Sequence, residues 1–170
     1  MADIKRSAVI SECGRYRHIL RRSWDASRPA LTFIMLNPST ADADQDDPTI
    51  RKCIGFADRI GYGSIIVVNL FDYRATKPAD LKRASFPSSA ENGWWIAKAM
   101  QESAGDVICA WGVNARGLTM PVEVLRAIRN AGHVPYALRL TEDGIPWHPL
   151  MLPYSCVPVE IPDRSEGGER

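Results

Sequence analysis

The sequence predicts an α/β fold in which helices cover both faces of a four-stranded, mainly parallel central sheet, with an N-terminal β-hairpin beside it. The first observation is a set of four short, mostly apolar runs, which are typical of strands buried on both faces. The second is that segments with helical spacing separate these runs, and such alternation is the signature of a three-layer αβα architecture. The expected strands are residues 30–36, 64–70, 106–111 and 134–140.

The expected hairpin precedes these strands. Residues 7–24 favour two short strands that meet at a turn around Cys13 and Gly14. Polar and apolar residues are mixed on both faces of the second of these strands, so the pattern does not say which face is buried.

The first helix has the clearest boundaries. Asp47 stands directly before Pro48, which is the pattern of an N-cap followed by proline at the first helical position. Gly61 marks the end of the helix. Apolar residues recur between these points at helical spacing, at Ile50, Cys53, Ile54, Ala57 and Ile60.

The rest of the chain predicts further helices and a single domain. The expected helices are residues 76–84, 88–103 and 121–131. Residues 141–153 form a loop that ends the folded body. We therefore expect one domain over residues 1–160 and a flexible polar tail over residues 161–170.

The composition limits the class of protein. The 170 residues, of which 45% are hydrophobic, are enough for one domain with a sizeable core. Lysine and arginine number 21 against 20 acidic residues, a balance that excludes a strongly polycationic nucleic-acid binder but not a local basic face. No apolar run is long enough to span a bilayer and no apolar signal core is present, so we expect a cytoplasmic protein without a membrane partner.

Neither the cysteines nor the acidic loop predicts a firm metal site. The four cysteines are dispersed and lack C-x-x-C spacing, so we expect reduced thiols, no metal cluster and no cofactor. Asp42, Asp44 and Asp46 match the start of an EF-hand loop. However, Asp47 stands where that loop needs glycine, and Cys53 stands at its twelfth position. A looser role of these carboxylates in holding Mg²⁺ stays open beside the alternative of a solvated loop.

Polar residues gather where the expected strands end. In folds of this class, ligands bind at the carboxyl ends of the strands. We therefore expect a cleft there, with Asp42 and Arg74 at its rim. Its expected walls are Asn37, Ser39, Asn69, Trp111 and His148. Taken singly, each of these residues is explained as well by a structural role as by a functional one.

Long segments of the chain resemble one known family. They read MLNPSTADADQDDPTIRKCIGFA, GYGSIIVVNLFDYRATKPADL, VICAWG and LTEDGIPWHPLMLP, in this order. These segments resemble the bacterial and phage family called domain of unknown function 1643, over residues from about 15 to 153. That resemblance implies no established activity.

A more distant resemblance implies an activity. The motif order is similar to that of the uracil-DNA glycosylase superfamily, in which Asn-Pro or Asp-Pro, Asn, Trp-Gly and His-Pro follow one another. The corresponding residues here are Asn37-Pro38, Asn69, Trp111-Gly112 and His148-Pro149. The chain departs from the pattern at Met35, where glycine is usual, at Ser39 and at Leu150.

The resemblance implies roles for individual residues in cleaving an N-glycosidic bond. Asn37 would position the attacking water, and His148 would donate a hydrogen bond to the leaving base. Asn69 would read the base edge, since a carboxamide offers both a donor and an acceptor. The residues that would complete the substrate site are Ser39, Asp42, Phe71, Tyr73, Arg74 and Trp111, with Phe71 or Tyr73 stacking on the base.

The sequence leaves three functions open. One is an enzyme that hydrolyses the glycosidic bond of a nucleobase in DNA, RNA, a free nucleoside or a nucleotide. Another is a module of the same fold that binds a nucleotide or nucleic acid without catalysis. The third is a metal-dependent enzyme that uses the loop from Asp42 to Asp47.

Overall fold

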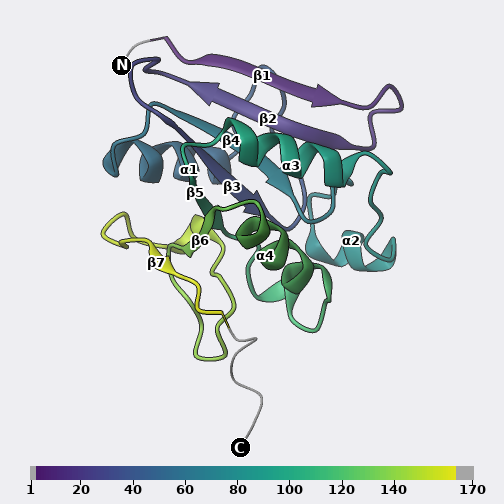
Figure 1. Cartoon of the computed structure of the whole chain (residues 1–170). Helices are drawn as coiled ribbons and strands as arrows, with labels where there is room; N and C mark the ends of the chain where they lie inside the picture. The colour runs from purple at the N-terminus through teal and green to yellow at the C-terminus, as the bar shows by residue number, and fades with distance from the viewer. Residues whose placement is uncertain (1–2, 164–170) are drawn as a thin grey trace, which may run out of the picture.

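The computed structural model describes residues 3–163 and has a mixed α/β fold (Figure 1). It contains two short 3₁₀ helices, η1 (Val113–Ala115) and η2 (Pro149–Met151). The helices are α1 (Pro48–Arg59), α2 (Pro78–Arg83), α3 (Asn92–Glu102) and α4 (Met120–Asn130). The strands are β1 (Lys5–Ile10), β2 (Arg17–Ser23), β3 (Ala30–Met35), β4 (Ser64–Asn69), β5 (Asp106–Cys109), β6 (Val134–Ala137) and β7 (Val159–Glu160).

Within the described residues the strands form one seven-stranded sheet in the order β1-β2-β4-β3-β5-β6-β7. The four strands expected from the apolar runs are neighbours in this sheet, and each pairs with the next in parallel. The hairpin β1–β2 continues the same sheet, because β2 pairs with β4 in antiparallel register. The four expected strands are therefore the parallel centre of a larger sheet than expected, because the expected hairpin β1–β2 and the strand β7 belong to the same sheet.

Some expected boundaries also differ, for local physical reasons. The third helix begins at Asn92 and not at residue 88. The buried carboxylate of Asp72 accepts hydrogen bonds from the backbone N–H and the hydroxyl of Ser89, which hold the chain outside the helix. The expected strand 134–140 ends at Ala137, after which the chain leaves the sheet.

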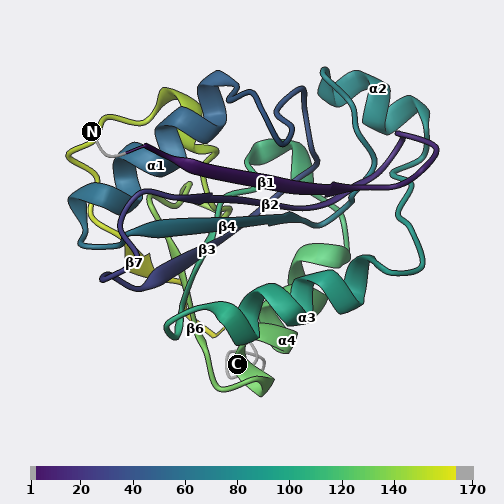
Figure 2. The same ribbon diagram turned by 90° about the horizontal axis from the view of Figure 1, so that it is seen from above.

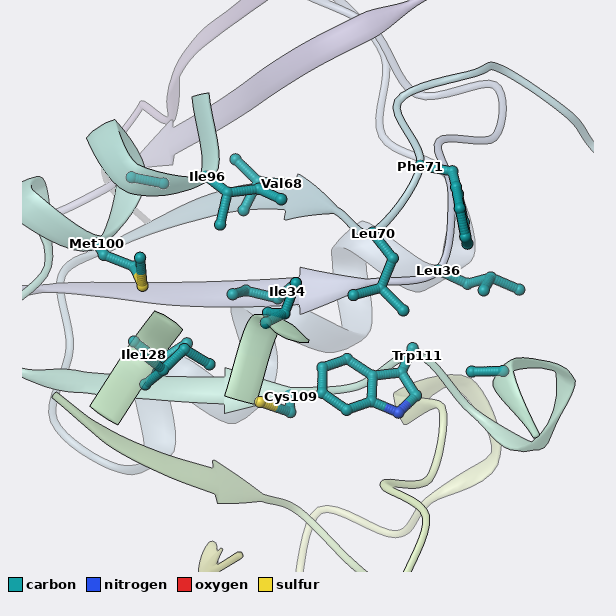
Figure 3. Close-up of a cluster of buried hydrophobic side chains, with 14 of the residues drawn as sticks. Ile34, Leu36, Val68, Leu70, Phe71, Ile96, Met100, Cys109, Trp111 and Ile128 are labelled. Atoms are coloured by element: carbon teal, nitrogen blue, oxygen red, sulfur yellow. The ribbon is translucent and has the colours of Figure 1, made fainter. Parts of the chain in front are cut away.

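Helices lie on both faces of the sheet (Figure 2). The side chains of β3 alternate between the faces, so that Phe33 packs in one apolar cluster and Ile34 in the other. Phe56 of α1 belongs to the cluster of Phe33. Ile96 of α3 and Ile128 of α4 belong to the cluster of Ile34, which Figure 3 shows. The chain therefore crosses from β3 to β4 on one face and from β4 to β5 on the other.

The ends of the described chain continue this packing. Ile161 is buried, and its N–H donates a hydrogen bond to the carbonyl of Pro135, 2.9 Å away. Most of the expected polar tail, residues 164–170, lies outside the described residues. Over residues 3–163, no helix is long and apolar enough to cross a membrane.

Candidate functional site

The strand order creates a switch point between β3 and β5. The connection that leaves β3 runs over the face of α1, whereas the connection that enters β5 runs over the opposite face, so the loops after these two strands separate. A crevice at such a point is the usual ligand site in open α/β sheets. A cleft of about 670 Å³ lies there. We call it the switch-point cleft; its walls are the loop after β3, the first turn of α1, the residues after β5 and the loop at residues 147–151.

Asn37 presents an acceptor at this cleft. It lies two residues beyond the end of β3, and its side-chain Nδ2 donates hydrogen bonds to the carbonyls of Pro38 and Ala75, at 2.9 and 2.8 Å. Both contacts are to carbonyl oxygens, which fixes the orientation of the amide, because only the NH₂ group can donate. Oδ1 has no hydrogen-bond partner among the described residues, so it is available to accept a hydrogen bond in the cleft.

His148 presents a donor at the same cleft. Its Nδ1 accepts a hydrogen bond from the backbone N–H of Leu150 at 3.3 Å, so in the neutral ring the proton is on Nε2. Burial lowers the pKa of His148 below its ordinary value, although the charge of Asp47 acts in the opposite direction. The imidazole is therefore neutral at pH 7 and can donate a hydrogen bond through Nε2.

A glycine positions this histidine. Gly112 lies three residues beyond β5, which ends at Cys109 and not at Trp111 as expected, and it has φ 78° and ψ 176°, a conformation that only glycine adopts readily. A Cβ atom built on Gly112 would lie 3.1 Å from Cβ of His148. The N–H of Gly112 also donates to the carbonyl of Pro146 at 3.0 Å. The close approach of these two backbone segments brings His148 to the switch point.

Asp47 is the one charged residue in the lining of the switch-point cleft within residues 3–163, and the lining contains no lysine or arginine. Its Oδ1 caps α1 by accepting a hydrogen bond from the N–H of Ile50 at 2.8 Å. The sequence indicated this cap, with a metal-binding loop as an alternative role, but it did not indicate that Asp47 lies in the cleft. Asn114, which follows the expected strand 106–111, and Trp147, which precedes His148, also line the cleft but were not among the expected wall residues.

Trp111 forms a wall of the cleft. Its side chain is part of the apolar cluster on the face of α3 and α4, and the residue is only 2% exposed (Figure 3). Ser39 lines the cleft from the loop after β3 and is partly exposed. The structure thus brings together four of the five residues expected to form the walls: Asn37, Ser39, Trp111 and His148.

The fifth residue, Asn69, is buried and does not line the cleft. It pairs across the sheet with Met35, which does, and it is 1% exposed. Neither Nδ2 nor Oδ1 of Asn69 has a hydrogen-bond partner among the described residues. The sequence pattern located the strand end correctly but did not show how deep this side chain would lie.

Two aromatic residues expected to stack on a base lie elsewhere. Phe71 is buried, and its ring centroid is 5.2 Å from that of Phe86. Tyr73 contacts Tyr16 edge-on, with the centroids 5.9 Å apart. Neither residue lines the switch-point cleft, and Trp111 and Trp147 are the aromatic residues that do.

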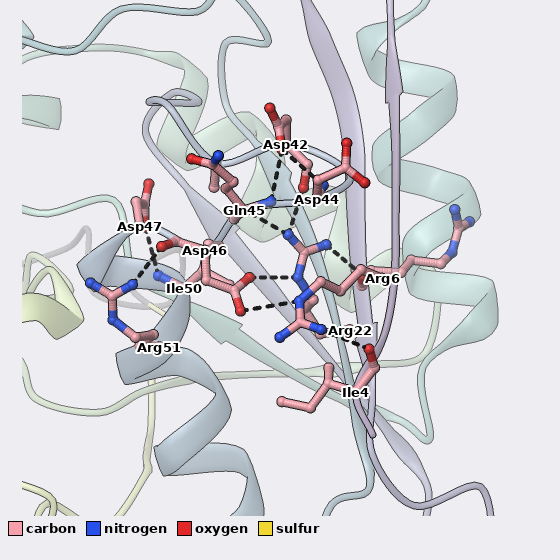
Figure 4. Close-up of polar contacts among 12 residues, drawn as sticks. Ile4, Arg6, Arg22, Asp42, Asp44, Gln45, Asp46, Asp47, Ile50 and Arg51 are labelled. Carbon is pink, nitrogen blue, oxygen red and sulfur yellow. Dashed lines mark hydrogen bonds and ion pairs between the residues drawn. The ribbon is translucent and has the colours of Figure 1, made fainter. Parts of the chain in front are cut away.

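The residues expected at the rim, Asp42 and Arg74, are also outside the lining. Arg74 donates a hydrogen bond to the carbonyl of Gly14 at 3.2 Å. Oδ1 of Asp42 accepts hydrogen bonds from the backbone N–H groups of Asp44 and Gln45, at 2.8 and 2.9 Å (Figure 4). These contacts fold the acidic loop on itself and lower the pKa of Asp42.

The acidic loop is fastened to the sheet by an arginine. Arg22 of β2 is fully buried, and its Nε donates to Oδ1 of Asp46 at 2.6 Å (Figure 4). Its Nη2 donates to the carbonyl of Asp42 at 2.5 Å. The carboxylates of Asp42, Asp46 and Asp47 therefore have different partners. Over the described residues, no group of three or more His, Cys, Asp or Glu side chains is placed to hold a metal ion.

Comparisons with known proteins identify a family. The model of one family, described as protein of unknown function (DUF1643), matches residues 17–150. No curated protein matches the chain, and no solved structure matches it. None of these comparisons shows a relation to uracil-DNA glycosylases. The family match spans most of the chain, including the segments that carry Asn37, Asp47, Trp111 and His148, so the chain belongs to the DUF1643 family.

Proposed function

We propose that the switch-point cleft binds a nucleobase and that the chain hydrolyses the N-glycosidic bond of a nucleoside there. The observation that carries this proposal is the presence in one cleft of a free amide oxygen, on Asn37, and a neutral imidazole donor, on His148. The motif order that resembles uracil-DNA glycosylases supports the same reaction, as an analogy.

In the proposed reaction, the bond between the sugar C1′ and the base nitrogen breaks and its electrons leave with the base. Nε2–H of His148 donates a hydrogen bond to the base as negative charge develops on it. Oδ1 of Asn37 accepts a hydrogen bond from a water, whose oxygen then bonds to C1′. The departing base takes a proton from solvent, and the proton lost by the water returns to solvent.

Asp47 gives the cleft a negative charge that suits this reaction. The sugar becomes cationic as the base departs, and a carboxylate in the same cleft stabilises that cation. Asp47 acts electrostatically on His148, since its charge raises the pKa of that residue against the effect of burial. We assign Asp47 to stabilising the sugar cation and to taking the proton from the attacking water before that proton passes to solvent.

The charges of the lining favour a small substrate over a nucleic acid. Binding of a polynucleotide relies on lysine and arginine contacts to phosphates. The lining holds Asp47 and no basic residue over the described part of the chain. We therefore assign a nucleoside without phosphates, in which the base lies against Trp111 or Trp147 and its polar edge meets Ser39 or Asn114.

A second candidate function is binding of a nucleobase without catalysis. The observation that favours it is that the carboxylate in the lining, that of Asp47, already accepts a hydrogen bond as the cap of α1. An amide such as Asn37 orients water but barely deprotonates it. The two candidates differ in one result, which is whether free base is released.

The test is release of free base from a panel of nucleosides and from DNA that contains uracil or modified bases. We expect release from a nucleoside, and a loss of about a hundred- to a thousand-fold in His148→Ala, which is the usual effect of removing one such donor. Asn37→Ala should slow release while binding of the base survives. Asp47→Asn removes the charge but keeps the helix cap, because asparagine caps as well as aspartate.

His133→Ala is the matched control, because His133 lies outside the cleft and contacts the carbonyl of Gly105 at 3.1 Å. It should release base at the wild-type rate. Binding of a base by the wild type without release would favour the second candidate. Release that is unchanged in His148→Ala, Asn37→Ala and Asp47→Asn would contradict the assigned roles.

A further inference from the structure

A second hollow, of about 650 Å³, lies on the other side of Trp111. We call it the α4 cavity. It is enclosed by one side of α4 along its whole length, the segment from Ala115 to Leu118, the loop from Gly144 to Pro146 and the chain from Ile161 to Asp163. Trp111 lines both hollows, so the two sites share a wall but open between different elements.

The walls of the α4 cavity are mostly apolar. Leu118, Leu125, Ile145 and Ile161 contribute to the same buried cluster as Trp111 or pack against it. Val122 of α4 also lines the cavity and is 58% exposed, which leaves apolar surface open to solvent. A concave, apolar hollow of this volume has the size of a small-molecule site and not of a flat interface.

The charged residues of the lining are three arginines and one aspartate, in contrast to the single aspartate of the switch-point cleft. Arg116 is paired with Asp143, with Nη2 2.9 Å from Oδ2. Arg129 donates to the carbonyl of Ile161 at 2.9 Å. Arg126 makes no hydrogen bond or ion pair within the described residues, so its guanidinium is available to a ligand.

We propose that the α4 cavity binds a small organic anion with a flat apolar body, such as an aromatic carboxylate. The apolar walls bury the body of the ligand, and Arg126 pairs with its carboxylate at the rim, where a guanidinium can make two parallel hydrogen bonds. This proposal does not depend on glycosidic-bond hydrolysis, because no residue except Trp111 is common to the two linings.

The test compares naphthalene-2-carboxylate with its uncharged analogue naphthalene-2-carboxamide. Each is titrated into the protein while backbone amide resonances are followed by NMR. We expect saturable shifts at Gly117, Leu118, Gly144 and Ile145, and a dissociation constant about threefold to fivefold lower for the carboxylate, as one partly exposed ion pair provides. Arg126→Gln should abolish this preference and leave binding of the carboxamide unchanged.

Matched variants separate the two hollows. Val122→Trp fills the mouth of the α4 cavity and should abolish binding of both probes. Val113→Trp makes the same change at the rim of the switch-point cleft, where Val113 is 48% exposed, and should leave both probes bound. Both valines are exposed, so neither variant should disturb folding. Shifts that map outside the α4 cavity, or a preference for the carboxylate that survives in Arg126→Gln, would overturn the proposal.

Discussion

Replacing Gly112 with alanine is expected to lower stability and to displace His148 at the same time. The backbone of Gly112, with φ 78° and ψ 176°, lies in a region that is essentially restricted to glycine, and placing another residue there costs about 1–3 kcal/mol. The added Cβ would also lie 3.1 Å from Cβ of His148, so the histidine must move by a few tenths of an ångström. A hydrogen bond from Nε2 to a ligand is sensitive to such a shift.

The assay combines urea denaturation with NMR of the His148 imidazole. Gly117→Ala is the matched control, because Gly117 also has φ 78° but a Cβ there would meet no atom within 4 Å. We expect both variants to lose stability, and only Gly112→Ala to move the His148 resonances and to weaken nucleobase binding. Unchanged His148 resonances in Gly112→Ala would refute the inference that this glycine positions the histidine.

Three further predictions concern the core, the pH dependence and the thiols. Arg22→Met leaves the carboxylate of Asp46 without its main partner, so the free energy of unfolding measured in urea should fall by about 3–5 kcal/mol. A decrease of less than about 1 kcal/mol would contradict this prediction. Burial lowers the pKa of folded His148, so the unfolded chain takes up this proton first as the pH falls. The stability of the wild type relative to His148→Gln should therefore be constant above about pH 6.5 and decrease below it, and a flat difference down to pH 5 would count against this. Cys13 is exposed whereas burial raises the pKa of Cys53, so mass spectrometry should find iodoacetamide on Cys13 long before Cys53.

Local signals in the sequence were enough to predict the inner strands and the first helix. Residues 64–70 contain β4, and the pair Asp47-Pro48 marks the start of α1, because burial on both faces and helix capping leave patterns within a few residues. The extent of the sheet depends on pairing between distant segments. β7 contains only Val159 and Glu160 and pairs antiparallel with β6, and a strand of two residues is too short to show an alternation of polar and apolar residues in the sequence.

The candidate site was predictable in position but not in detail. Asn37 and His148 were expected at the carboxyl edge of the sheet, and both line the switch-point cleft there. Asn69 is the last residue of β4 and Phe71 lies two residues beyond it, but the depth of both side chains depends on the pleat and on the packing of the chain beyond the strand. Asp47 was assigned to the helix cap and, in one alternative, to a metal-binding loop, because a single sequence does not show that a capping carboxylate also faces a cleft.

The central claim is that the switch-point cleft is a nucleobase site, and a crystal structure soaked with a panel of nucleobases and nucleosides tests it most directly. We expect a base beside Trp111, with Nε2 of His148 and Oδ1 of Asn37 both within hydrogen-bonding distance of the ligand or of a water bound to it. Binding in the crystal should be lost in Val113→Trp. A base bound elsewhere on the molecule, or a cleft that stays free of base at saturating concentrations of the whole panel, would contradict the claim.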